Sequence, residues 1–112
     1  MKRGDIYFAN LNPTIGSEIK KTRPVLIVSN NANNSFASTV TIVPITSNVK
    51  KVYPFEVFLS SKQTGLSKQS KAQCHQIRTI SKLRIMGDVI GLVNFDLLRQ
   101  VDSAIRLHLD LR

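Results

Sequence analysis

The stretch from residue 20 to residue 48 reads KKTRPVLIVSNNANNSFASTVTIVPITSN and predicts two buried strands with polar groups at their ends. An apolar run at 25–28 follows Arg23 and Pro24, and a second run within 39–45 leads to Thr46. Near-continuous apolar runs of this length are typical of strands buried on both faces, and proline is tolerated at the first position of a strand. We therefore expect strands at 24–29 and 39–45.

These two strands would deliver a cation and a group of small polar side chains to sheet ends. Arg23 carries a rigid fork of N–H donors, and Thr46 and Ser47 add hydroxyl groups. A cation among fixed donors suits a phosphate group whose negative charge grows during a reaction. The pattern therefore predicts phosphoryl chemistry at this place.

The remaining chain favours a mainly β protein. Alternating or apolar segments predict further strands at 5–9, 53–59, 71–80 and 89–93, and residues 81–85 fit a short extra strand or a turn. Polar segments at 10–22, 30–35, 47–52 and 60–70 predict loops. Many short strands with one terminal helix indicate a small SH3-like β-barrel or a twisted antiparallel sheet, in a single domain spanning 1–112.

The one convincing helix begins near Asn94, a good N-cap residue, with Asp96 in its first turn. An apolar stripe predicts that the helix packs on the sheet or, alternatively, forms half of a dimer seam; its members are Leu97, Leu98, Val101, Ala104, Ile105, Leu107 and Leu109. The pairs Asp102–Arg106 and Arg106–Asp110 have the spacing of helix-surface ion pairs.

Charge is distributed unevenly along the chain. Lys and Arg number 16 and Asp and Glu 7, which gives a formal net charge of +9. Residues 1–86 hold thirteen of the bases and three of the acids, whereas residues 87–112 hold three bases and four acids. Solubility alone does not need this asymmetry, so we expect one electropositive face and a nucleic-acid partner.

Composition also excludes several classes. The single cysteine, Cys74, rules out an intrachain disulfide and a cysteine-based zinc site, and its apolar surroundings indicate a buried core thiol. No apolar run approaches the ~18 residues that span a bilayer, and no signal-peptide stretch is seen, so we expect a cytoplasmic protein without a membrane partner. The scarcity of acids argues against a two-metal nuclease, and we expect neither metal nor cofactor.

RNA cleavage without a metal remains possible, because the RNA 2′-OH can attack its own phosphate to leave a 2′,3′-cyclic phosphate and a 5′-OH. Arginine stays protonated in proteins and is therefore a poor general base. His75 has a suitable intrinsic pKa if the strand at 71–80 runs beside the other two. A mechanism with paired histidines would need His75 beside His108, which we do not expect because His108 lies in the terminal helix.

Several ordered motifs resemble the MazF/PemK (Kid) family, the endoribonuclease toxins of type II toxin–antitoxin systems. They are RGDIYFANLNPTIGSE at 3–18, TRPVLIVSN at 22–30, VPITSN at 43–48, QIRTI at 76–80 and the helix after IGLVN at 90–94. The resemblance implies a compact barrel-like fold, a homodimer, and metal-independent, sequence-specific and ribosome-independent cleavage of single-stranded RNA. It also implies inhibition by a cognate antitoxin, whose binding segment we expect to be acidic and disordered, with DNA contacted only through the antitoxin.

The resemblance also implies roles for individual residues. Arg23 matches the catalytic arginine of the R-P motif, and Thr46 matches the catalytic threonine of the I-T motif. The residues expected to line the RNA groove are Ser17, Glu18, Ser47, Asn48, His75, Gln76 and Arg78. Kid-like members have Arg-Cys-Asp where this chain has Gln73, Cys74 and His75, and a histidine where it has Ser17, so their acid and base assignment does not apply.

Two other classes stay open at this point. CcdB toxins share the fold and poison gyrase, but they end in Trp-Gly-Ile, whereas this chain has no tryptophan. A non-catalytic RNA-binding barrel would keep the basic face without needing Arg23 and Thr46 together, yet it would be expected to expose stacking aromatics. A cleavage assay on long RNA separates the three classes.

Overall fold

The computed structural model describes residues 1–13, 15–18 and 21–112. Its strands are β1 (Asp5–Asn10), β2 (Thr22–Ile27), β3 (Thr39–Thr46), β4 (Glu56–Leu59), β5 (Ser70–Gln73), β6 (Arg78–Ser81) and β7 (Ile85–Leu92). Its helices are α1 (Asn31–Phe36), α2 (Ser61–Thr64) and α3 (Phe95–Leu109), with 3-10 turns η1 (Cys74–Gln76) and η2 (Lys82–Arg84). None of the helices in these described ranges is long and apolar enough to cross a membrane.

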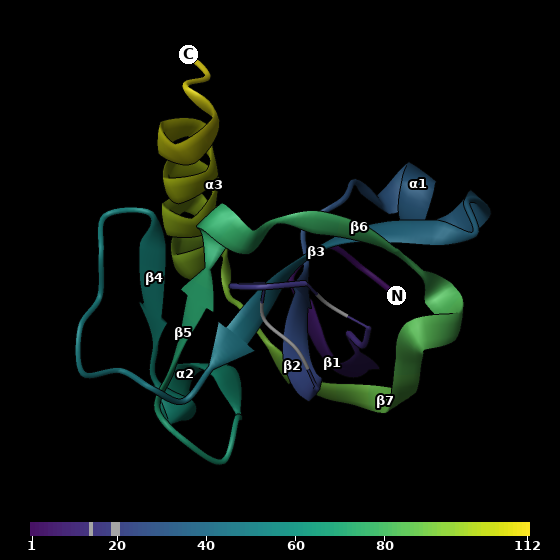
Figure 1. Cartoon of the computed structure of the whole chain (residues 1–112), viewed down its shortest axis with the longest axis horizontal. Coiled ribbons are helices and arrows are strands. Elements are labelled where there is room, and N and C mark those ends of the chain that lie inside the picture. The colour runs from purple at the N-terminus through teal and green to yellow at the C-terminus, as the bar shows by residue number, and fades with distance from the viewer. Residues whose placement is uncertain (14, 19–20) are drawn as a thin grey trace.

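The strands form one antiparallel sheet in the order β4-β5-β3-β2-β1-β7, and β6 pairs with β3 beside that path. β3 is the hub, because residues 39–42 pair with β6, residues 42–44 with β2, and residues 45–46 with β5. Within the described chain the path is open, with β4 and β7 at its ends (Figure 1). The prediction of a mainly β fold with a C-terminal helix is confirmed, in the form of a curved open sheet.

Two hydrophobic cores cover the two faces of the sheet, because successive side chains of a strand point to opposite sides. The first core, which α3 completes, includes Leu26, Val43 and Ile45. The second includes Val25, Ile27 and Ile42. Every one of these side chains is almost completely buried, so the central strands β2 and β3 have both faces covered, as the apolar runs predicted.

Helix α3 begins where expected. The Asn94 side chain accepts a hydrogen bond from the Leu97 N–H at 2.9 Å, and Leu97, Val101 and Ala104 are buried against the first core. The helix contacts β4 and η1 and continues past the body of the protein (Figure 1). Leu107 and Leu109, which the sequence placed on its packed stripe, are therefore exposed.

The ion pair made by α3 also differs from the prediction. Asp102 pairs with Arg3, which lies near the N-terminus, instead of with Arg106 one turn away. The Arg3 guanidinium also donates to the Val28 carbonyl at 2.9 Å. This contact ties the helix to the start of the chain and to the end of β2, which a helix-surface pair could not do.

Two expected loops contain short helices. In the asparagine-rich segment 30–35, the Asn30 side chain accepts from the Asn33 N–H at 2.8 Å and caps α1. In the segment 60–70, Ser60 caps α2, and Gly65 ends it with a φ of +81°, a value that glycine adopts without strain. The same residues that make good caps also favour turns, so the sequence predicted loops.

The expected strand at 71–80 is broken in the structure. β5 and β6 pair with different halves of β3, and η1 turns the chain between them. η2 occupies most of 81–85, where a short strand or a turn was expected. β7 begins at Ile85 and runs through Gly87 and Asp88, ahead of the strand expected at 89–93, and the β1–β7 register shifts between Ile6 and Phe8.

Candidate functional site

The β2–β3 register aligns the two residues that the sequence singled out. Val25 pairs with Pro44, Leu26 with Val43 and Ile27 with Ile42. The pairing ends at Val25 and Pro44, and Arg23 and Thr46 each lie two residues beyond that last pair. Side chains two residues apart in a strand share a face, so Arg23 and Thr46 belong to one face at neighbouring ends of β2 and β3.

A third side chain extends this alignment into the next strand. Lys71 of β5 pairs directly with Thr46 of β3. The Lys71 ammonium, however, is paired with Glu56 and its side chain is only 9% exposed, so the polar row that faces a ligand consists of Arg23 and Thr46. The row lies on the face of the second core, because Arg23 has the same strand parity as Val25, and Thr46 the same as Ile42.

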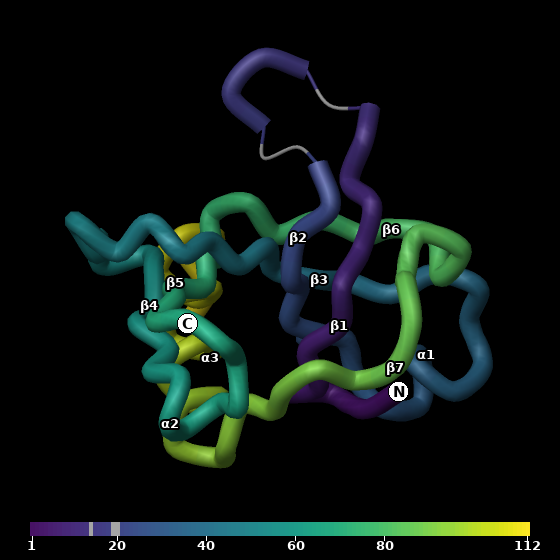
Figure 2. Tube along the Cα trace, turned by 90° about the horizontal axis from the view of Figure 1, so that it is seen from below, coloured from purple at the N-terminus to yellow at the C-terminus, as the bar shows by residue number. Residues whose placement is uncertain are grey.

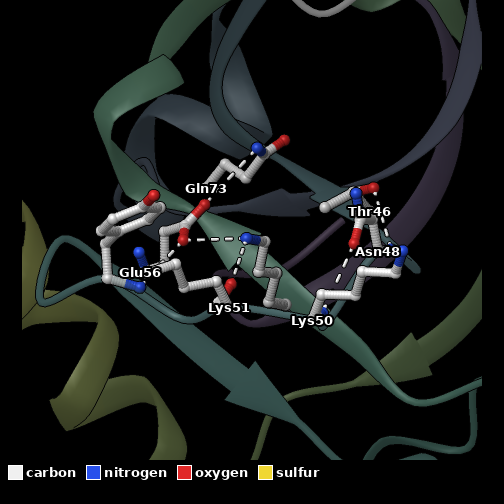
Figure 3. A network of polar contacts seen from close by, with 8 residues as sticks. Thr46, Asn48, Lys50, Lys51, Glu56 and Gln73 are labelled. Atoms are coloured by element: carbon white, nitrogen blue, oxygen red, sulfur yellow. Dashed lines mark hydrogen bonds and ion pairs between the residues drawn. The ribbon is translucent and has the colours of Figure 1, made fainter.

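The residues after Thr46 remain beside it. The Thr46 Oγ1 accepts a hydrogen bond from the Asn48 N–H at 3.2 Å, and the Asn48 Oδ1 accepts from the Lys50 N–H at 3.4 Å (Figure 3). Thr46 is half-buried, whereas Ser47 and Asn48 are exposed. The end of β3 therefore presents two hydroxyls and an amide at one edge, as the sequence predicted.

Arg78 and Gln76 mark the other end of the same face. Arg78 pairs with Ile42, so it shares the face of the polar row, and it is half-buried. Ile42 precedes Thr46 by four residues, which is about 13 Å along a strand. Gln76 closes the η1 turn just before β6. The two residues are thus placed to contact a ligand that extends along this face from Arg23 and Thr46.

His75 has a different setting. It lies in η1, where its ring packs edge-on against Phe55 with the centroids 4.5 Å apart, and His108 of α3 is 6.3 Å away. The expectation that His108 would be remote is wrong, because α3 packs on η1. Burial lowers the pKa of His75, and the nearby His108 and Lys71 act in the same direction against the attraction of Glu56.

His75 is also separated from the polar row. β5 runs beside β3 but not beside β2, and His75 follows Lys71 by four residues after the chain has turned into η1. Its Nδ1 atom is buried and has no hydrogen-bond partner within the described structure. Next to it, Cys74 is fully buried, and burial raises the pKa of its thiol to about 12, as suits a core residue.

The segment between β1 and β2 contributes Ser17 and Glu18, and its described parts project from the sheet (Figure 2). Both residues are exposed, and the Glu18 carboxylate accepts from the Ile15 N–H at 2.7 Å. The Lys21 N–H donates to the Asn12 side chain at 3.0 Å. Lys20 lies outside the described residues.

A cleft of about 540 Å³ opens beside Arg23. Its apolar walls come from the face of the first core and include Pro24, Ile45, Leu66 and Ile90. Lys21, Arg23 and Lys68 also line it. The sequence did not predict this cleft, since it depends on the loop after α2 folding back over the ends of β2 and β3.

Glu56 and Lys71 form an ion pair that sequence reasoning missed. The Lys71 ammonium lies 2.9 Å from the Glu56 carboxylate, and their side chains are only 9% and 2% exposed. Burial on its own would raise the pKa of Glu56, but hydrogen bonds from the Tyr53 N–H and from Lys71 hold it below its ordinary value. The sequence feature that could have indicated this ion pair is Glu56, an isolated acid in an otherwise apolar strand within a basic segment.

The described residues contain no group of three histidine, cysteine or acidic side chains that could hold a metal ion. The constellation at the end of β2 and β3 instead consists of a guanidinium, hydroxyls and amides. Such groups donate hydrogen bonds to phosphate oxygens.

Comparison with known proteins finds a matching family and two similar endoribonucleases. Residues 2–109 match the family of PemK-like, MazF-like toxins of type II toxin-antitoxin systems. The chain is 46% identical to endoribonuclease MazF9 of Mycobacterium tuberculosis over 116 residues, covering 99% of this chain and 98% of the relative. It is 38% identical to endoribonuclease EndoA of Bacillus subtilis over 112 residues, covering 99% and 96%.

A solved structure, an endoribonuclease in complex with its cognate antitoxin from Mycobacterial species, superimposes with a TM-score of 0.79 at 26% identity. The match covers 100% of this chain and 97% of that one. The chain therefore belongs to the family of PemK-like, MazF-like toxins of type II toxin-antitoxin systems.

Proposed function

We propose that this toxin is an endoribonuclease that cleaves single-stranded RNA without a metal ion and leaves 2′,3′-cyclic phosphate and 5′-OH ends. The observation that carries the proposal is the β2–β3 pairing, because Arg23 and Thr46 follow its last pair, Val25 with Pro44, by two residues each on one face. The endoribonucleases to which the chain is similar support it. The proposal treats residues 1–112 as a single toxin domain.

In the proposed reaction the 2′-oxygen attacks the adjacent phosphorus, and the bond from phosphorus to the 5′-oxygen breaks. The 2′-OH proton passes to a base, and the departing 5′-oxygen takes up a proton. Arg23 stabilises the charge on the phosphorane by donating N–H groups. Thr46 Oγ1 accepts the Asn48 N–H and retains its own O–H as a donor, which in this reaction is donated to a phosphate oxygen.

The RNA strand would run along the second-core face. Ser47 and Asn48 would contact the nucleotides beside the cleaved bond, and Gln76 and Arg78 those further along. His75 would border the strand, while its packing against Phe55 suits a structural role better than that of a base. Ser17 and Glu18 would contact RNA from the β1–β2 segment.

We also propose that the protein works in the cytoplasm as a homodimer and that a cognate antitoxin neutralises it. The net charge of +9 suits both an RNA strand and an acidic antitoxin segment. A relative of the same fold has been solved with its cognate antitoxin. DNA would be contacted only through the antitoxin.

The test is to incubate the purified protein with a long single-stranded RNA in excess chelator and to analyse the new ends. We expect undiminished cleavage and products that polynucleotide kinase can label without prior dephosphorylation, because they carry a 5′-OH. Loss of activity in chelator, or 5′-phosphate ends, would contradict the mechanism. Absence of any cleavage would favour a non-catalytic RNA-binding role or a protein target.

A further inference from the structure

The segment 47–55 connects Thr46 to β4, and side chains hold its course. At its start, Asn48 and Lys50 donate their backbone N–H groups to Thr46 Oγ1 and Asn48 Oδ1. At its end, the Tyr53 N–H donates to the Glu56 carboxylate at 3.0 Å, while the Glu56 N–H donates back to the Tyr53 carbonyl at 2.8 Å. Both ends of the segment are therefore fastened to the strands on either side.

Lys71 fastens its middle. The ammonium donates to the Lys51 carbonyl at 2.6 Å and to the Glu56 carboxylate at 2.9 Å (Figure 3). An ammonium has three N–H donors, and these two acceptors lie on the segment and on the strand that follows it. Because Lys71 is also the strand partner of Thr46, one side chain links the polar row to the course of the segment.

Glu56 completes the arrangement from the opposite side. Its other carboxylate oxygen faces the Gln73 amide at 3.5 Å, so it has partners on β5 as well as on the segment. The Tyr53 ring stacks on Phe55 with the planes 7° apart and the centroids 5.4 Å apart, and the Lys51 ammonium lies 5.3 Å from the Tyr53 ring. The stacked rings of Tyr53 and Phe55 and the exposed Lys51 side chain therefore belong to the same segment that the buried ion pair holds.

We propose that Lys71 and Glu56 are positioning residues for RNA binding, which hold segment 47–55 so that Asn48, Lys50 and Lys51 meet the strand beside Thr46. The inference deepens the proposed nuclease function and rests on it. Lys50 and Lys51 are cations at or near the surface, suited to phosphates flanking the cleaved bond. Without the buried pair they would have to be ordered each time RNA binds, which weakens binding but leaves the chemistry at Arg23 unaltered.

The decisive variant is the double substitution Lys71→Met with Glu56→Gln. Removing one partner of a buried ion pair leaves an uncompensated charge and destabilises a protein, whereas removing both avoids that cost. The double variant also keeps the net charge of the chain, so general attraction to RNA is unaltered. After the Glu56→Gln substitution, the side-chain amide oxygen would still accept the Tyr53 N–H, while the contact with Lys71 and the long interaction with the Gln73 amide are lost.

The measurements are amide hydrogen exchange of 47–55 and the kinetics of RNA cleavage. We expect faster exchange in that segment, a KM raised about tenfold, as when a few side chains must be ordered on binding, and an unchanged kcat. Lys71→Leu with Glu56→Gln, which also removes both charges of the pair, is the second variant, should the first double variant fold poorly. Lys62→Met with Asp88→Asn removes two exposed charges of opposite sign, so it is the matched control and should behave as wild type.

Wild-type exchange in 47–55 together with a wild-type KM in a folded double variant would overturn the proposal. A fall in kcat at constant KM would also overturn it, since that result would place the pair in the chemistry. If the unmodified protein does not cleave RNA, the nuclease proposal fails separately. The exchange measurement would then still decide whether Lys71 and Glu56 anchor the segment.

Discussion

The polar row and the histidine cluster differ in what surrounds them. The row of Arg23 and Thr46 is followed by exposed Ser47 and Asn48, and Arg23 and Ser47 also line the cleft. The cluster of His75, His108 and Phe55 holds two imidazoles, but His75 is packed edge-on against an aromatic ring beneath α3. The location of a side chain therefore matters more than the intrinsic pKa of its group, because hydrogen-bond donors reach a phosphate only where the end of the sheet is open.

The largest expected effect comes from breaking the polar row. Arg23→Ala and Thr46→Ala should each reduce kcat, because removing one preorganised donor to a developing oxyanion costs about 10²–10³-fold. Arg23→Lys should restore little, since an ammonium cannot reproduce a planar fork. Single-turnover cleavage of a short RNA measures both effects. Near-normal rates in a folded Arg23→Ala protein would remove Arg23 from the mechanism.

A smaller effect is expected when the histidine cluster is disrupted. If His75 were the general base, its loss would reduce the cleavage rate about 10²–10⁴-fold. We instead expect His75→Phe to leave the maximal rate and its pH profile nearly unchanged. His108→Asn serves as the comparison, because His108 is exposed and lies at the far end of α3. If one limb of the pH–rate profile disappeared in His75→Phe but not in His108→Asn, His75 would be the general base. The histidine cluster would then belong to the catalytic site.

The smallest effect concerns stability. The folded-state pKa of His75 lies below its ordinary value of 6.5, chiefly through burial. The unfolded chain therefore takes up a proton first as the pH falls, so the contribution of His75 is complete above its unfolded pKa and is lost as the pH drops towards the folded pKa. The unfolding free energy should fall less between about pH 8 and about pH 5 in His75→Phe than in wild type. Equal pH dependence would indicate that the ring is not desolvated.

Sequence reasoning worked where a local pattern decides the structure. The apolar runs before Thr46 and after Arg23 predicted β2 and β3, and Asn94 predicted the start of α3, because burial on both faces and helix capping leave clear signatures. Family motifs supplied Arg23 and Thr46. Their alignment follows from a register that the two apolar runs alone do not specify.

The parts that were missed depend on pairing between distant segments. Nothing local in the 71–80 segment indicates that β3 takes β5 and β6 as separate partners, so the break at Cys74 was not foreseen. The same break carries His75 to α3. Likewise, Lys71 and Glu56 are 15 residues apart in sequence and look like ordinary charged residues until the β4–β5 ladder brings them together.

The most direct test of the central claim compares two RNA oligonucleotides that differ only in the 2′-OH of the nucleotide at the cleaved bond. Cleavage by Arg23 and Thr46 requires that hydroxyl as the nucleophile. We predict that the all-RNA strand is cut in chelator, whereas the 2′-deoxy strand stays intact and competes for binding with similar affinity. Cleavage of the 2′-deoxy strand at the same bond and a similar rate would contradict the account.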